Sequence, residues 1–196
     1  MRKAPRQARS KAMVAAIVEA AARILGQQGW AGFTTNKVAE AAGVSIGSFY
    51  QYFPDKHSLT EAILHRHLDD CLAVVRRATR SALPAAALAA ELVDGMIAVH
   101  SATPGLHRAL LDDAPDVPSA RDPHSAFEAE FLGHYIAAVA SCRGRAPTEA
   151  DRITGVLISD AIDGAIHNAA RRGTLASPAM REGLIEMIAL YLSRRP

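Results

Sequence analysis

Residues 34–59 of the chain, TTNKVAEAAGVSIGSFYQYFPDKHSL, place hydroxyl, amide, ammonium and phenol groups close together in sequence. Hydroxyl groups of this kind donate hydrogen bonds to phosphate oxygens, and lysine supplies a cation for the same purpose. Amide and small apolar side chains can read base edges in the major groove. The segment therefore predicts contact with a nucleic acid.

Two short helices joined by a tight turn must position these groups. Thr34 or Thr35 predicts the N-cap of a first helix that ends near Ala42. Gly43 suits the sharp turn that follows. Ser45 predicts the N-cap of a second short helix, which the next proline ends. This order is the plan of a helix-turn-helix.

Apolar residues hold the two predicted helices together. Val38 and Val44 are placed at the junction, and Phe49 and Phe53, four residues apart, share the buried face of the second helix. We expect the remaining residues of that helix to face outward: Ile46, Gly47, Ser48, Tyr50, Gln51 and Tyr52.

The segment resembles the DNA-binding domain of the tetracycline-repressor (TetR) family over about residues 11–65. The resemblance is carried by TTNKVAEAAGVS, GSFYQYF and DKHSL, and by ILGQQGWAGFTT before them. It departs from the commonest pattern at Ser48, where Thr is more usual, whereas Tyr52 stands where His or Tyr is usual. The resemblance implies a homodimeric transcription factor, usually a repressor, that binds a palindromic operator and responds to a small-molecule effector.

The resemblance also implies a set of DNA-binding residues: Thr34, Thr35, Asn36, Lys37, Ser45, Ile46, Gly47, Ser48, Tyr50, Gln51, Tyr52 and Lys56. Ile46, Gly47 and Gln51 fall at positions that reach bases, and the others cap helices or reach phosphates. Alternatives remain: the threonines can serve only as caps, and Tyr50 and Tyr52 can be ordinary half-buried aromatics. Gly47 can simply allow its backbone to approach a phosphate closely.

Charge is distributed unevenly along the chain. Residues 1–60 contain eight Lys or Arg and three Asp or Glu, whereas residues 61–196 contain fourteen and seventeen. The N-terminal part therefore has a net charge of +5 and the rest −3. Such asymmetry is typical of a polyanion-binding domain. The basic arm either enters a minor groove or is a solvated tail; it holds Arg2, Lys3, Arg6, Arg9 and Lys11.

Helical periodicity continues over the rest of the chain and predicts an all-α fold of about nine helices. The expected ranges are 10–28, 35–42, 46–53, 55–80, 85–100, 106–111, 125–142, 148–172 and 178 onward, with Ser10, Asp55, Ser125, Thr148 and Ser177 as caps. The proline-rich segment 112–123 is expected to be irregular. We expect an arm (1–10), a DNA-binding domain (11–56) and a helical ligand-binding and dimerisation domain (57–196).

The last two long helices carry enough apolar residues to form half of a four-helix dimer interface. The candidates are Leu157, Ile158, Ile162, Ile166, Leu184, Ile188 and Tyr191. The alternative is that these residues pack only within the monomer.

Polar and aromatic residues within apolar helices are candidates for a ligand pocket: His100, Phe127, Phe131, Tyr135, Asp160, Asp163 and His167. The three aromatic residues form one helical stripe, which is also typical of a core. Asp163 and His167 share a helix face, where an ion pair is a simpler interpretation than a metal or cationic ligand.

Other function classes have little support. The chain has no GxxxxGK[ST] or GxGxxG pattern, so we expect no enzyme and no cofactor. Cys71 and Cys142 are too isolated to predict a disulfide scaffold or a thiolate metal site. Glu91 and Asp94 interrupt the longest apolar stretch, which argues against a membrane span and for a cytoplasmic protein. A helix-turn-helix adaptor without a small-molecule ligand, or an all-helical enzyme, remains as an alternative.

Overall fold

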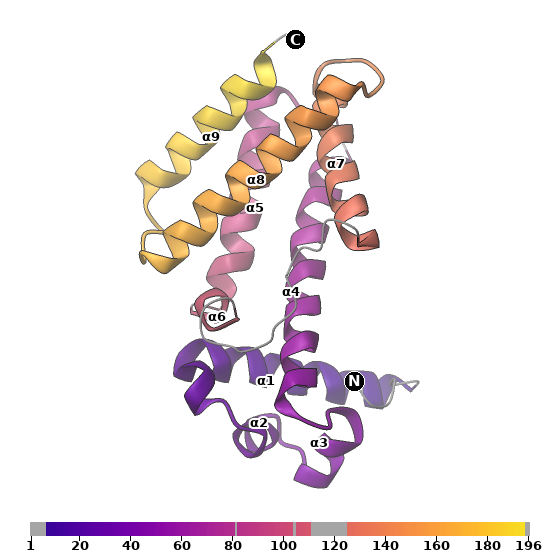
Figure 1. Ribbon diagram of the computed structural model, residues 1–196, viewed down its shortest axis with the longest axis vertical. Helices are drawn as coiled ribbons and strands as arrows, with labels where there is room; N and C mark the ends of the chain where they lie inside the picture. The colour runs from indigo at the N-terminus through magenta and orange to yellow at the C-terminus, as the bar shows by residue number, and fades with distance from the viewer. Residues whose placement is uncertain (1–6, 81, 104, 111–124, 195–196) are drawn as a thin grey trace. The chain divides into compact units, whose positions relative to one another are not determined.

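The computed structural model describes residues 7–80, 82–103, 105–110 and 125–194. Within these ranges the chain forms nine α-helices and no strand, as the sequence predicts (Figure 1). The helices fall into two compact units. Unit 1 contains the described residues up to Leu68 and from Thr103 to Leu110, and unit 2 contains Asp69–Ala102 and the described residues from Ser125 onward.

Helix α1 (Ala8–Gly32) is longer than the sequence predicts at both ends. Gln7 is its N-cap, and Ser10, the predicted cap, is instead the third helical residue, where its hydroxyl accepts a hydrogen bond from the Gln7 amide. Gly29 interrupts the helix with φ +63°, a backbone conformation that glycine adopts readily. The predicted stop is therefore a kink, after which one more turn follows.

Helices α2 (Thr35–Ala41) and α3 (Ile46–Tyr52) have the predicted caps and the predicted turn. Gly43 has φ +67°, so the turn uses the left-handed conformation. Val38 and Phe49 are fully buried, and Val44 packs against the same cluster. These contacts fix α3 against α1 and α2.

Helix α4 (Lys56–Ala78) begins in unit 1 and continues into unit 2. Asp55 caps it as predicted, because its carboxylate accepts a hydrogen bond from the Ser58 amide at 2.7 Å. This hydrogen bond lowers the pKa of Asp55. Leu59 and Ile63 in the first turns are buried in the unit 1 core, so unit 1 extends beyond residue 56, the expected end of the first domain.

Unit 1 also contains a segment from much later in the chain. Helix α6 (Leu106–Arg108) packs on α1 through Leu106, and Leu110 joins the same buried cluster. Gly105 lies so close to α1 that a β-carbon there would collide with the carbonyl oxygen of Gly26. The short helix was predicted, but its return to the first domain was not. The predicted irregular segment 112–123 lies outside the described residues.

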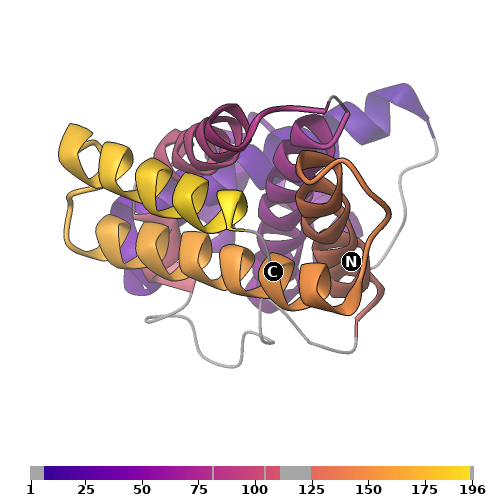
Figure 2. The same cartoon turned by 90° about the horizontal axis from the view of Figure 1, so that it is seen from above.

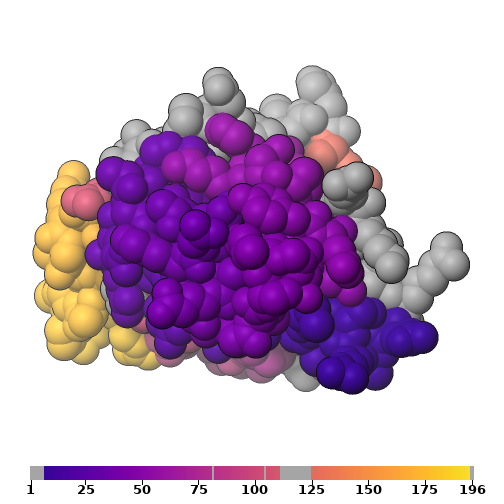
Figure 3. Space-filling view, turned by 90° about the horizontal axis from the view of Figure 1, so that it is seen from below, coloured from indigo at the N-terminus to yellow at the C-terminus, as the bar shows by residue number. Residues whose placement is uncertain are grey.

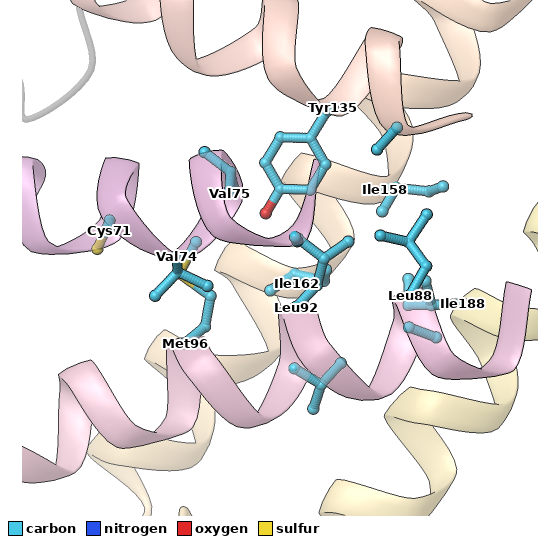
Figure 4. Close-up of a cluster of buried hydrophobic side chains, with 14 of the residues drawn as sticks. Cys71, Val74, Val75, Leu88, Leu92, Met96, Tyr135, Ile158, Ile162 and Ile188 are labelled. Carbon is cyan, nitrogen blue, oxygen red and sulfur yellow. The ribbon is translucent and has the colours of Figure 1, made fainter. Parts of the chain in front are cut away.

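Unit 2 is built from the second part of α4 and from α5 (Ala85–Ala102), α7 (Ala126–Cys142), α8 (Glu149–Arg171) and α9 (Pro178–Ser193). Helices α8 and α9 run antiparallel, joined by a short turn (Figure 1). Ser125, Thr148 and Ser177 cap their helices as predicted. The core lies between the helices, where Tyr135 points among Val75, Leu92 and Ile162 (Figure 4).

Helix α5 is long and apolar enough to cross a membrane by length and composition alone. One face of it, which includes Leu88, Leu92 and Met96, is instead buried in the core of unit 2. Its two acidic side chains pair with arginines of other helices, Glu91 with Arg77 and Asp94 with Arg181. Helix α5 is therefore a core helix in this unit.

Candidate nucleic-acid interface

The start of α2 presents hydroxyl groups that are already engaged in hydrogen bonds. Thr34 Oγ1 accepts a hydrogen bond from the Lys37 amide at 3.4 Å, which confirms the predicted cap. Thr35 Oγ1 lies 3.1 Å from the hydroxyl of Tyr50. This bond joins α2 to α3 on the exposed side of the helix-turn-helix, where Asn36 is exposed as well.

Lys37 is exposed, yet its ammonium group has partners within the unit. It donates to Gln28 Oε1 at 2.7 Å and to the Gly32 carbonyl oxygen at 3.1 Å, both near the end of α1. A phosphate contact by Lys37 therefore requires that these bonds be exchanged.

Helix α3 presents its first turn and one side to solvent. Ser45 Oγ accepts from the Ser48 amide at 3.1 Å and lies 2.9 Å from the Ser48 hydroxyl. Ile46 is 40% exposed and Tyr50 42% exposed, and Gln51 is also exposed. The side chains of α2 and α3, purple in Figure 3, lie together on one face of the unit. A recognition helix needs such a free face to enter a major groove.

Gly47 leaves the backbone of the first turn of α3 open. A β-carbon at this position would meet nothing closer than Ser45 Oγ at 3.9 Å, so the free chain has room for a larger side chain. The glycine therefore serves no packing need within the unit. The backbone of this turn is therefore accessible from outside the unit.

Tyr52 does not face outward as the sequence analysis predicts. Its side chain is only 7% exposed and belongs to the cluster that contains Phe49 and Phe53. The prediction of an outward position is wrong because Tyr52 stands three residues after Phe49 and shares its buried helix face, whereas Tyr50 lies on the open side. The ring is structural.

Lys56 also has a structural role that the sequence analysis did not anticipate. Its ammonium group lies 3.8 Å from the ring centroid of Trp30. It donates to the carbonyl oxygens of Trp30 at 3.4 Å and Phe33 at 3.5 Å. The half-buried lysine thus connects the start of α4 to the end of α1, and its ammonium group is already in contact with the Trp30 ring and two carbonyl oxygens.

Residues Gly43 to Gly47, GVSIG, have the letter pattern of the nucleophile elbow of serine hydrolases. That motif requires a strand before the serine and a helix after it. Here helix α2 precedes Ser45, and the serine hydroxyl caps α3. The local structure is that of a helix-turn-helix.

The basic arm is described only in part. Arg9 and Lys11 lie on the exposed first turns of α1. The other three basic residues predicted for the arm, Arg2, Lys3 and Arg6, lie outside the described residues.

In unit 2 the structure brings together three of the predicted pocket residues. The rings of His100 and His167 are 5.1 Å apart, and His167 Nδ1 lies 3.5 Å from Asp163 Oδ2. His100 is buried, and Nδ1 of its ring is 2.8 Å from the Met96 carbonyl oxygen. Burial lowers the pKa of His100 to about 4.

The other predicted pocket residues lie elsewhere. Phe131 and Tyr135 are part of the closed core, and Phe127 stacks on Phe131 with ring centroids 5.6 Å apart. The stripe that these three aromatic residues form therefore belongs to the core of unit 2, the alternative to a ligand pocket that the sequence left open. Asp160 is exposed on α8.

Most residues predicted for the dimer interface are buried within the protomer. Five of them are at most 6% exposed, which makes the prediction wrong for Ile158, Ile162, Ile166, Leu184 and Ile188. Apolar residues occupy two sides of both α8 and α9, and these five lie on the side that packs into the core of unit 2.

Of the predicted interface residues, Leu157 is exposed and Tyr191 is half-buried. The sequence analysis missed the other exposed apolar residues on these helices: Ile153, Met187 and Leu190.

A histidine contact in unit 1 was also missed. The Nε2 atoms of His67 on α4 and His107 on α6 are 2.9 Å apart. Because the two residues are forty positions apart, local spacing gives no signal for this contact.

Comparisons with known proteins agree with this architecture. Residues 17–63 match the family model described as "Bacterial regulatory proteins, tetR family". Residues 84–192, more than half of the chain, match "Tetracyclin repressor-like, C-terminal domain". The HTH-type transcriptional repressor KstR2 of Rhodococcus jostii (strain RHA1) is 32% identical over 90 residues, and the match spans 44% of each chain.

Solved structures share the fold over nearly the whole chain. A TetR-family transcriptional regulator from Streptomyces coelicolor is 22% identical, with a TM-score of 0.64 and coverage of 93% of this chain and 98% of that one. The regulator FadR from Bacillus subtilis, solved in complex with stearoyl-CoA, is 15% identical, with a TM-score of 0.68 and coverage of 89% and 97%. At these identities the likeness is one of fold.

Proposed function

We propose that this chain, which belongs to the tetR family of bacterial regulatory proteins, is a repressor that binds a palindromic operator as a homodimer and leaves it when a small molecule binds unit 2. The chain is a transcriptional regulator of that family. What we propose beyond this is its binding to a palindromic operator, its assembly as a homodimer and its release by a small molecule. The regulator would act in the cytoplasm, where its operator lies.

One observation carries the proposal: α3 is capped and packed, yet presents an open face. Phe49 and Tyr52 anchor it, whereas Ile46, Tyr50 and Gln51 remain exposed. A short helix held rigidly with such a face can enter the major groove. There a glutamine can make a bidentate contact with adenine, and a tyrosine hydroxyl can reach a phosphate.

A second copy of the chain would supply the other half of the operator contact. Two-fold symmetric dimers place their recognition helices about 34–36 Å apart, one turn of DNA, and this explains palindromic operators. The exposed apolar residues Leu157 on α8 and Leu190 on α9 support a pairing through these two helices. We propose these residues, with Ile153 and Met187, as the interface in place of the buried ones.

An effector would bind unit 2 and favour a state with lower affinity for DNA. The Bacillus subtilis neighbour solved with stearoyl-CoA supports the idea that this fold accepts a small molecule. A helix-turn-helix adaptor that lacks an effector is the second reading, and no feature of unit 2 favours it.

The test is a selection of bound duplexes from a random pool at about 150 mM salt, followed by anisotropy titrations on the selected sequence. We expect a palindrome that the protein binds at least a thousandfold more tightly than scrambled DNA. Gln51→Ala should change the base preference at one or two operator positions, each by about 1–3 kcal/mol.

The control variant is Glu61→Ala, which replaces an exposed residue of α4 outside the predicted DNA contacts. It should leave the base preference unchanged. Binding without sequence preference, lost at modest salt, would indicate only counterion release by the basic residues and would contradict the proposal.

A further inference from the structure

A cleft lies in unit 2 at the end of the bundle where α5 begins and α7 and α9 end. Its volume is about 510 Å³, and it is lined by Ala85, Cys142, Arg143, Arg145, Leu192, Ser193 and Arg194. In Figure 1 the α7–α8 connection and the end of α9 lie side by side at this end of the unit, and Figure 2 shows the same end from above. A volume of this size is in the range of small-molecule sites.

A buried carboxylate orients two of the three arginines. Asp151 is fully buried and accepts from Arg143 Nη1 at 2.6 Å and from Arg145 through both terminal nitrogens. Gly144 between them has φ +67°, and this turn lets both arginines reach the same carboxylate. Burial would raise the pKa of Asp151, but the hydrogen bonds from Arg145, Thr148 and Arg143 hold it well below its usual range.

The acceptor capacity of Asp151 is used up by this arrangement. Its oxygens also accept from the amide and the hydroxyl of Thr148 at 2.8 and 2.7 Å. The side chain of Arg143 is only 11% exposed, and its Nε atom is buried with no hydrogen-bond partner among the described residues. A buried donor without an acceptor costs free energy, which the hydrogen bonds of Arg143 to Asp151 and to the Arg194 carbonyl oxygen must offset.

The charge of the cleft selects an anion. Three arginines, Arg143, Arg145 and Arg194, line it, and among the described residues Asp151 supplies the carboxylate that pairs with the first two. Guanidinium groups match the planar fork of carboxylate and phosphate oxygens. The half-buried Ala85 and Cys142 add an apolar wall, which an inorganic ion would leave uncovered.

From this geometry we propose that the cleft binds a small organic anion, with a phosphate or carboxylate group at the arginines and an apolar part against Ala85 and Cys142. The proposal concerns unit 2 alone. It is independent of the proposed function, because its test requires no DNA and no change in operator binding.

Cys142 provides a reporter within the cleft. It is half-buried and lines the cleft, whereas the other cysteine, Cys71, is buried in the core of unit 2. The test measures the rate at which N-ethylmaleimide labels Cys142 in the full chain, followed by peptide mass spectrometry. The ligands are phenyl phosphate and benzoate, with benzyl alcohol as the neutral match and sodium chloride at equal ionic strength.

We expect phenyl phosphate, benzoate or both to slow labelling of Cys142 at least threefold with a saturable dose dependence, and benzyl alcohol and chloride to leave the rate unchanged. Arg194→Ala shortens the side chain of a residue that lines the cleft. The hydrogen bond between Arg194 and Arg143 uses the backbone carbonyl oxygen of Arg194, so the fold should persist. It should weaken the protection at least threefold, and Arg194→Glu should abolish it.

The matched control is Arg172→Ala, which removes an exposed arginine at the other end of α8 and should retain full protection. Calorimetry should show one anion per chain in the wild type and a matching loss of affinity in Arg194→Ala. No protection by either anion, or equal protection in Arg194→Glu, would overturn the proposal.

Discussion

At the scale of single residues, Tyr50 combines a local contact with a proposed contact to DNA. Its ring packs edge-on against Phe49, with ring centroids 5.4 Å apart, and its hydroxyl meets Thr35 at 3.1 Å. The first contact fixes the ring on α3, and the second holds the hydroxyl at the edge of α2. The phenol is thus oriented before any phosphate arrives, which lowers the entropy cost of binding.

Tyr50→Phe removes the hydroxyl and keeps the ring. We expect operator affinity to fall about three- to tenfold, the equivalent of one hydrogen bond of roughly 0.5–1.5 kcal/mol. The midpoint of thermal unfolding should change little, because the hydroxyl is exposed. Anisotropy and calorimetry on the same samples check both statements. A large loss of stability with unchanged affinity would assign Tyr50 to the fold instead.

His100 has a different kind of single-residue effect, one on stability. Burial lowers its pKa to about 4, the nearby His167 adds to this effect, and the Met96 carbonyl and Asp163 oppose it. Between pH 4 and 6.5 the unfolded chain therefore binds more protons at this residue than the folded chain does. Stability is present above the unfolded pKa and is lost as pH falls through this range.

The expected loss at His100 is of order 2 kcal/mol between pH 7.5 and pH 4.5. His100→Gln cannot gain a charge, so its urea midpoint should fall less over the same pH range. The comparison of wild type and variant removes the contribution of histidines that do not interact with His100, whereas His167, which does interact with it, contributes to the difference. Identical pH profiles would show that the imidazole charges without penalty.

At the scale of helices, the start of α4 is joined to the end of α1 through Lys56. The cation over the Trp30 ring and the two carbonyl contacts connect elements that are twenty-six residues apart. This joint supports α3, because Phe53 and Leu59 on either side of the α3–α4 turn are buried in the same cluster. Lys56 therefore positions the recognition helix indirectly.

Lys56→Ala should lower the free energy of unfolding of unit 1 by about 1 kcal/mol, the scale of a partly buried cation–π contact. Trp30 is the one tryptophan of the chain, so its fluorescence during urea unfolding reports on this unit. Lys11→Ala, an exposed lysine on α1, is the control and should leave the midpoint unchanged. Equal midpoints for the two variants would restrict Lys56 to a surface role.

The helices themselves were largely predictable, because their ends carry local signals. Thr34, Ser45 and Ser177 each accept a hydrogen bond from the amide three residues on, as capping residues do. Ser10 was misplaced because the same hydroxyl chemistry serves at the third helical position. Tyr52 was misplaced although it stands three residues after Phe49, a spacing that puts both side chains on one face of a helix.

At the scale of the whole molecule, sequence patterns say less, because they are local. The return of α6 to unit 1 depends on contacts such as that of Gly105 with Gly26, nearly eighty positions apart. The arginine cleft likewise joins Ala85 to residues near position 194. The helix-turn-helix was predictable because its whole site lies within twenty-six consecutive residues.

The sequence also did not show which apolar face of α8 and α9 points into the core. Leu157 and Ile158 are adjacent and equally apolar, yet the first is 48% exposed and the second 1%. A helix that is apolar on two sides has one face for its own core and a second for another surface. The burial of Ile158, Ile162 and Ile166 within the protomer therefore leaves the outer face available to a partner.

That outer face supports the last prediction, which concerns assembly. Ile153 and Leu157 are one turn apart on α8, and Met187 and Leu190 are one turn apart on α9, with Leu190 63% exposed. We propose that these four residues on two antiparallel helices form a self-complementary apolar face for a two-fold dimer. Leu157→Glu with Leu190→Glu should yield a monomer in sedimentation experiments at micromolar concentration, because two carboxylates would be buried without partners.

The monomeric variant should also lose operator affinity by at least a hundredfold, since one recognition helix then binds a half-site alone. Its helical content should remain that of the wild type, because both leucines lie outside the protomer core. Ala86→Glu adds a carboxylate on an exposed position of α5 and is the matched control. If the double variant stays dimeric, or if Ala86→Glu dissociates equally, the α8–α9 face is not the interface, and operator binding must rely on another contact between protomers.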